Sequence, residues 1–180
     1  MATINISDIQ IKFSDQFFFD TNVWLLLFGT VADYQRKDQD AYSNFLDKIL
    51  STDNAIFISS MVISEFANVL LRHDFKQWKT TNKYFDKEFK RDYVGTSDYK
   101  MTVKSIKALI KRILSLPVII LAPDNFNAIN IDNVNEYFDS VDFNDAYIAE
   151  LARMNNLNVV TNDRDFKSLD GYINVVTSQI

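Results

Sequence analysis

Short apolar runs that end in polar residues alternate along this chain with longer amphipathic segments. Each run is four residues long and almost free of charge, which is typical of strands buried inside a parallel sheet. The runs occupy residues 16–19, 55–58, 118–121, 158–161 and 173–176. Within residues 1–16, alternating Ile9, Ile11 and Phe13 suggest a further short strand or arm. The pattern therefore predicts five strands and an uncertain lead-in.

The segments between the runs have apolar residues three and four positions apart, which is the period of a helix with one buried face. We predict helices over residues 32–50, 61–72, 74–91, 99–115, 125–138 and 141–155, with a break at 94–98. Strands that alternate with helices indicate βαβ units. We therefore expect an α/β fold with a central, mainly parallel five-stranded sheet flanked by helices, formed as one domain over residues 1–180.

Composition excludes several kinds of chemistry. The 180 residues include no cysteine, so disulfides, thiolate zinc sites and a cysteine nucleophile are ruled out. The N-terminus lacks the basic and apolar regions of a signal peptide. No run reaches the roughly 18 apolar residues that a membrane helix needs. We expect a soluble cytoplasmic protein with no membrane contact.

Four carboxylates stand beside the predicted strands and helix ends. Asp20 and Asp163 follow strands directly, whereas Glu65 and Asp145 lie near the starts of helices. Each has an ordinary explanation by itself, as a turn residue, a solvated side chain or a residue favoured by a helix dipole. Sites in open α/β sheets lie beyond the carboxyl ends of the strands, however, so the four can converge there. Clustered carboxylates need a cation or protonation.

An all-oxygen set of ligands without histidine or cysteine suits Mg²⁺ or Mn²⁺. Such ions commonly bind substrate phosphates and assist the hydrolysis of phosphodiesters. The carboxylates therefore predict a metal-dependent phosphodiesterase. His73, the single histidine, has no part in this hypothesis.

The order and setting of the four acids resemble the motifs of PIN domains. The matching stretches are Phe18-Phe19-Asp20-Thr21-Asn22, Ser64-Glu65, Asp145-Ala146-Tyr147-Ile148-Ala149 and Val160-Thr161-Asn162-Asp163-Arg164-Asp165-Phe166. The resemblance extends over roughly residues 17–176. It implies a three-layer sandwich around a parallel sheet, and a divalent-metal-dependent endoribonuclease. It also implies that the chain is similar to VapC-type toxins of bacterial toxin–antitoxin pairs.

By this resemblance, Asp20, Glu65, Asp145 and Asp163 would be the catalytic metal ligands for Mg²⁺ or Mn²⁺. Asn22 and Thr161 would support them by hydrogen bonding. Asp142 lies three residues before Asp145, where it could share a helix-end face with it or cap the helix. Family resemblance also suggests RNA as substrate, a small antitoxin as partner and a homodimer.

The segment between the second and third motifs is long and strongly basic. It has twelve basic and five acidic residues between positions 72 and 112, in a chain of net charge −5. Aromatic residues interleave with the cations, a combination that can grip phosphates and stack bases. The same pattern also fits a solvated face with aromatics in a core or against a partner. The candidate RNA-binding residues of this basic helical segment (about 72–115) are Lys76, Lys79, Lys83, Lys87, Lys90, Arg91, Lys104, Lys107, Lys111 and Arg112.

Two other functions compete with the nuclease. Haloacid-dehalogenase-like phosphatases also place an aspartate after the first strand, but they have a second aspartate where this chain has Asn22. A PIN-like module that binds RNA or protein without cutting would be expected to lack an acidic motif position, whereas all four are present here.

Overall fold

Six parallel strands form the centre of the molecule. The computed structural model describes residues 2–29, 36–123 and 126–179. Its strands are β1 (Thr3–Asn5), β2 (Phe17–Phe19), β3 (Ile56–Ile58), β4 (Ile119–Leu121), β5 (Asn158–Val160) and β6 (Asn174–Thr177), in the spatial order β1-β6-β5-β2-β3-β4. The α/β class and the parallel sheet are confirmed, but the count of five strands was one too low. The additional strand β1 pairs with β6, whereas Ile9, Ile11 and Phe13 form no strand.

Strand β2 lies at the middle of the sheet and at its topological switch point. Its three residues, Phe17, Phe18 and Phe19, are fully buried. It pairs with β3 on one side and β5 on the other. The chain therefore leaves β2 in one direction and returns to it from the other, which opens a crevice at the carboxyl ends of these strands.

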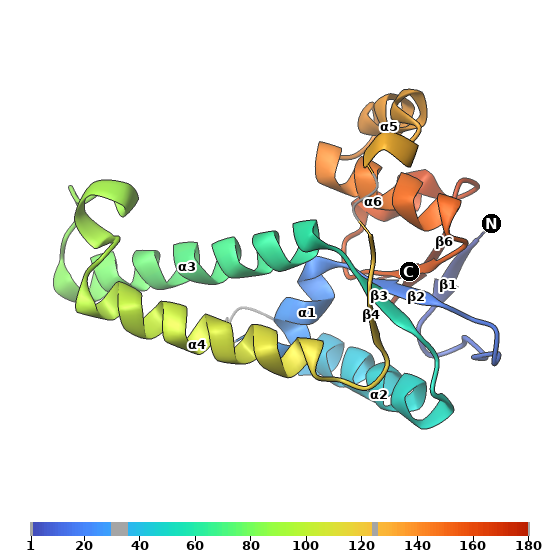
Figure 1. Cartoon of the computed structure of the whole chain (residues 1–180), viewed down its shortest axis with the longest axis horizontal. Helices are drawn as coiled ribbons and strands as arrows, with labels where there is room; N and C mark the ends of the chain where they lie inside the picture. Colours follow the sequence, from blue (N-terminus) through green and yellow to red (C-terminus); the bar gives the residue numbers. More distant parts are fainter. Residues whose placement is uncertain (1, 30–35, 124–125, 180) are drawn as a thin grey trace.

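Helices cover both faces of the sheet. They are α1 (Thr21–Phe28), α2 (Arg36–Thr52), α3 (Ser60–Asn82), α4 (Ser97–Leu114), α5 (Ile131–Phe138) and α6 (Phe143–Met154). Figure 1 shows α5 and α6 on one face and α1 and α2 on the other, which is a three-layer arrangement. Short π and 3₁₀ turns lie at Phe89–Tyr93, Phe126–Ala128 and Asp165–Leu169. None of the described helices is long and apolar enough to cross a membrane.

Helix α1 was absent from the prediction. It begins directly after β2, where Asp20 caps it by accepting a hydrogen bond from the Thr21 N–H at 2.6 Å. Val23, Trp24, Leu25 and Leu26 are all buried, so the segment has no polar face that would reveal a helical period. A short helix that is apolar all round cannot be distinguished from a strand by periodicity.

Other predicted helix boundaries also change. The prediction of two helices over 61–72 and 74–91 was wrong. A single helix, α3, continues unbroken from Ser60 to Asn82. It ends where Lys83 adopts a left-handed conformation. The helix expected over 125–138 begins only at Ile131, after the 3₁₀ turn. Residue 125 and the start of the helix expected over 32–50 lie outside the described residues.

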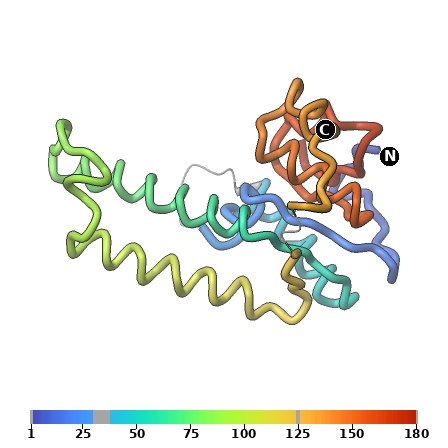
Figure 2. The backbone as a smooth tube through the Cα atoms, turned by 45° about the horizontal axis from the view of Figure 1, so that its top comes forward, coloured from blue at the N-terminus to red at the C-terminus, as the bar shows by residue number. Residues whose placement is uncertain are grey.

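Helices α3 and α4 form a long hairpin that projects from the sheet (Figures 1 and 2). At its tip, the π-helical turn Phe89–Tyr93 folds back against α3. Tyr93 is fully buried there, and its hydroxyl donates a hydrogen bond to Asp74 of α3. Thr102 of α4 donates to the same carboxylate at 2.6 Å. The aromatic residues of the basic segment thus build an ordered tip.

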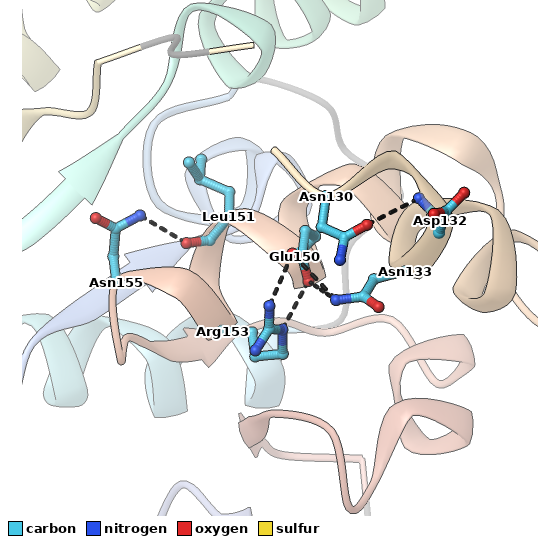
Figure 3. A network of polar contacts seen from close by, with 7 residues as sticks. All are labelled: Asn130, Asp132, Asn133, Glu150, Leu151, Arg153 and Asn155. Atoms are coloured by element: carbon cyan, nitrogen blue, oxygen red, sulfur yellow. Dashed lines mark hydrogen bonds and ion pairs between the residues drawn. The ribbon is translucent and has the colours of Figure 1, made fainter. Parts of the chain in front are cut away.

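A second polar network joins α5 to α6. Glu150 of α6 is fully buried, and its carboxylate accepts hydrogen bonds from Arg153 at 2.7 and 2.9 Å (Figure 3). Asn133 of α5 donates to it at 3.2 and 3.3 Å. Burial alone would raise the pKa of Glu150, but the hydrogen bonds from Arg153 and Asn133 outweigh it, so the pKa is lowered. This network keeps Glu150 ionised and holds α5 against α6.

Candidate functional site

Asp20 is held in a defined orientation at the carboxyl end of β2. Its Oδ1 accepts the hydrogen bond from the Thr21 N–H, and its Oδ2 accepts from Asn22 at 2.6 Å and from the Thr161 hydroxyl at 2.8 Å. The aspartate is 5% exposed. Thr161 follows β5, the neighbouring strand. Two adjacent strand ends therefore fix one buried carboxylate.

Asn22 and Thr161 connect the ends of β2 and β5. The Asn22 amide donates to the Thr161 hydroxyl at 3.1 Å, and its carbonyl accepts from the Asn162 N–H at 2.9 Å. The Thr161 hydroxyl also accepts from the Asp163 N–H at 3.0 Å. These contacts are what a supporting role requires, because they orient Asp20 and the loop that carries Asp163.

Glu65 reaches this edge from the second turn of α3. Thr21 donates its hydroxyl hydrogen to Glu65 at 2.9 Å, which ties the start of α1 to α3. Ser59 caps α3 directly after β3, so Glu65 is presented near the carboxyl end of that strand. Thr21 was not singled out from the sequence, although its position between Asp20 and Asn22 was a signal.

Asp145 lies in the first turn of α6. The carboxylate of Asp142 accepts a hydrogen bond from the Asp145 N–H at 3.0 Å, so Asp142 is the N-cap of this helix. Of the two roles considered for Asp142, the structure shows the capping one. By starting α6 at this point, the cap sets where Asp145 stands relative to β2 and β5.

The acids at this edge repel one another. Burial raises the pKa of Asp20 from 3.8 to about 7, with further increases from the charges of Glu65 and Asp163, although hydrogen bonds from Thr161 and Thr21 oppose the rise. Burial also raises the pKa of Asp145 to about 8, assisted by Asp20, Asp142, Asp163 and Glu65. The four predicted acids therefore act on one another electrostatically.

The residues fit a hydrated hard cation. Within residues 2–29, 36–123 and 126–179, no group of three or more His, Cys, Asp or Glu side chains is gathered closely enough to hold an ion alone. Mg²⁺ usually keeps several waters and is bound through one or two carboxylates. Asp20 is held in one orientation, and it has acidic neighbours whose negative charges need compensation. This arrangement suits a partly hydrated ion bound through one or two carboxylates, and not an ion enclosed by protein ligands on all sides.

Further contacts steady the loop after β5. The hydroxyl of Tyr42, on α2, donates to the Thr161 carbonyl at 2.5 Å. Burial raises the pKa of Tyr42, so the hydroxyl remains protonated and able to donate. Tyr42 was not singled out from the sequence, and nothing in the sequence indicated this contact.

The structure divides the ten predicted RNA-binding cations among three places. Lys76 and Lys79 are on α3, Lys83 caps it, and Lys104, Lys107, Lys111 and Arg112 are on α4. Lys87, Lys90 and Arg91 lie around the tip, where Lys87 and Arg91 form ion pairs with Asp92. Their role in RNA binding stays a prediction.

The fold and the site define an α/β protein with an acidic centre at the carboxyl edge of a parallel sheet. The PIN domain family model matches residues 17–172. The chain belongs to the PIN domain family, as the resemblance predicted. PIN domains are generally nucleases that use divalent metal ions.

Solved structures share this fold at low sequence identity. VapBC2 from Rickettsia felis, bound to a DNA fragment from its promoter, is 18% identical, with a TM-score of 0.53 over 90% of this chain and 98% of that chain. FitAB bound to the IR36 DNA fragment is 14% identical, with a TM-score of 0.53 over 91% and 96% of the two chains. The comparison with curated proteins found no match. At these identities the likeness shows the fold alone.

Proposed function

We propose that this protein is a divalent-metal-dependent endoribonuclease. The observation that carries the proposal is Asp20, a buried and oriented carboxylate at the switch point of a PIN fold. Its pKa is raised by burial and, to a smaller extent, by the charges of neighbouring acids. Such perturbed groups in a crevice are typical of catalytic sites.

In the proposed site, Asp20, Glu65, Asp145 and Asp163 would hold Mg²⁺ or Mn²⁺. When bound, the ion would polarise the scissile phosphate and help to generate the attacking hydroxide. The hydrogen bonds from Thr161, Asn22 and the Thr21 N–H hold the Asp20 carboxylate in one orientation. Thr21 does the same for Glu65. Because these carboxylates are oriented before the substrate binds, less free energy is needed to arrange them during the reaction.

We further propose that the protein is the toxin of a toxin–antitoxin pair and binds a small antitoxin protein. Support comes from the similar folds of VapBC2 and FitAB, which were solved bound to DNA. A homodimer is part of the same proposal. An antitoxin that covered the acidic edge would silence the enzyme, so the isolated chain is expected to be the active form.

The direct test is cleavage of a mixed single-stranded RNA pool by purified protein in Mg²⁺, Mn²⁺ or EDTA. Asp163→Asn removes the charge of a proposed metal ligand at nearly constant shape. It should therefore lower the rate of cleavage at least 100-fold. Asp139→Asn, an exposed acid at the end of α5, is the matched control and should cut normally. Cleavage that persists in EDTA or in Asp163→Asn would refute the proposal. RNA binding without cleavage would instead indicate a non-catalytic module.

A further inference from the structure

An open hollow of about 510 Å³ begins at Glu65 and extends along α3. Met61, Ser64, Asn68, Val69 and Arg72 of α3 line it with Glu65, and Asn144 at the start of α6 stands opposite. It therefore adjoins the proposed acidic site on the side where α3 and α6 begin. Apart from Glu65, none of the polar side chains that line this hollow has a role in the preceding assignments.

The wall contributed by α3 consists of two rows of side chains. Residues four apart lie above one another on a helix. Met61, Glu65 and Val69 form one row, with the carboxylate between two apolar side chains. Ser64, Asn68 and Arg72 form the other row. Arg72 lies seven residues beyond Glu65, so its Cα is about 10 Å farther along the helix axis.

The polar groups of the hollow are free to bind a ligand. Asn68 and Asn144 are exposed and take part in none of the side-chain hydrogen bonds found among the described residues. Arg72 likewise forms no ion pair in that part of the chain. Two amides, a guanidinium and a short apolar surface beside a carboxylate site suit one nucleotide, because amides bind base edges and arginine binds phosphate.

Arg72 is held in place by the tip of the hairpin. Its guanidinium carbon lies 4.0 Å from the centroid of the Phe89 ring. Phe89 packs in turn on Phe75 and Tyr93, with ring centroids 5.4 and 5.7 Å apart. A cation stacked on an aromatic ring keeps its charge and its outward donors. The ordered tip therefore positions a cation two helical turns from the acidic site.

We propose that this hollow is the subsite for the nucleotide next to the scissile phosphate of a single-stranded RNA. Arg72 binds the phosphate of that nucleotide, and Asn68 and Asn144 contact its base over Met61 and Val69. The inference rests on the proposed nuclease function and names where its substrate lies. It also gives the aromatic tip a role, which is to orient Arg72 rather than to stack bases.

The first test is the affinity for a fluorescein-labelled 12-nucleotide single-stranded RNA, measured by anisotropy in EDTA over a range of NaCl concentrations. Arg72→Ala should weaken binding about tenfold and reduce the slope of log affinity against log salt by about 0.7, the value for one lost phosphate contact on a single strand. Phe89→Leu should weaken binding two- to fourfold, because Arg72 loses its support but keeps its charge. Lys100→Ala, an exposed lysine on α4 outside the hollow, should change affinity less than twofold.

The second test concerns the base. The affinity of the wild-type protein should differ among four homopolymeric 12-nucleotide RNAs. Asn68→Ala or Asn144→Ala should reduce these differences in affinity about threefold. If Arg72→Ala and Lys100→Ala have the same affinity for RNA, or if the RNA does not bind, the subsite is refuted. The hollow would then bind another ligand, such as a protein segment. If these binding effects appear but no metal supports cleavage, the nuclease proposal fails, and the hollow is an RNA-binding site with no scissile phosphate beside it.

Discussion

Two buried carboxylates in the same α/β body have opposite electrostatic environments. Glu150 is 0% exposed and accepts hydrogen bonds from the Arg153 cation, so its pKa is lowered. Asp20 is 5% exposed and accepts three hydrogen bonds from neutral donors, so burial, with a smaller contribution from the charges of Glu65 and Asp163, raises its pKa to about 7. Both are well hydrogen-bonded, and they differ in the sign of the nearest charges.

The difference separates structural charge from functional charge. A buried ion pair within the protein compensates itself and leaves nothing for a ligand to neutralise. A buried acid among other acids lacks that compensation, and only a proton or an added cation can supply it. The first arrangement joins α5 to α6, whereas the second prepares the carboxyl edge of the sheet for a positively charged ligand.

The largest expected effect comes from breaking the compensated pair. Arg153→Ala should lower the free energy of unfolding by about 2 to 3 kcal/mol, because Glu150 would be left buried without its cation. The loss should be somewhat below that of a fully buried pair, since the Arg153 side chain is 37% exposed. Urea denaturation measures it. Arg164→Ala is the control, because that exposed arginine donates only to Gln179 and should cost about 0.5 kcal/mol or less.

Neutralising an acid that has no cation beside it should change the free energy of unfolding in the opposite direction. Asp145→Asn should raise the free energy of unfolding by about 1 kcal/mol at pH 8 in EDTA, after allowance for partial exposure and a weaker interaction with the helix dipole. The pKa of Asp145 is raised from 3.8 to about 8, so the folded state binds more protons between these values. Wild-type stability therefore falls as pH rises through this range. The advantage of Asp145→Asn should disappear near pH 4, and a pH-independent gain would contradict this explanation.

The smallest expected effect is stabilisation by the ion itself. A MgCl₂ concentration about three times its dissociation constant should add about 0.8 kcal/mol to the free energy of unfolding at pH 8. Thermal unfolding in MgCl₂, compared with NaCl of equal ionic strength, measures this. Asp163→Asn should lose most of the shift while Asp139→Asn keeps it. Equal shifts in both variants would show that Mg²⁺ binds elsewhere.

Local residue patterns predicted the strands well because the runs are short, apolar and bounded by polar residues. Phe17 to Phe19 and Asn158 to Val160 were found within a residue or two of their ends. Strand β1 was missed because Thr3, Ile4 and Asn5 form a strand only by pairing with β6. The continuity of α3 through His73 and Asp74 was missed as well, since packing against α4 and the tip supports it.

The assignment of the candidate site residues stays a prediction, but the sequence did select acids that the fold places near one another. Asp20, Glu65, Asp145 and Asp163 were chosen from their order and their places beside strands and helix ends, and the structure brings them within electrostatic reach. The contacts of Thr21 with Glu65 and of Tyr42 with Thr161 were not predictable, because each joins residues far apart in the chain.

The sequence alone determined the α/β class, the PIN resemblance and the acids, because these depend on local hydrophobic pattern and on motif order. Only the tertiary structure decided which charges are compensated. Arg153 stands three residues after Glu150 on the same helix, a spacing that allows the pair, but only the fold buries it. The acids whose charges act on Asp20 come from distant segments and approach it only in the folded chain. Likewise, the stacking of Arg72 on Phe89 requires the hairpin to fold back on itself. Electrostatic compensation depends on distances in space, which the order of residues does not contain.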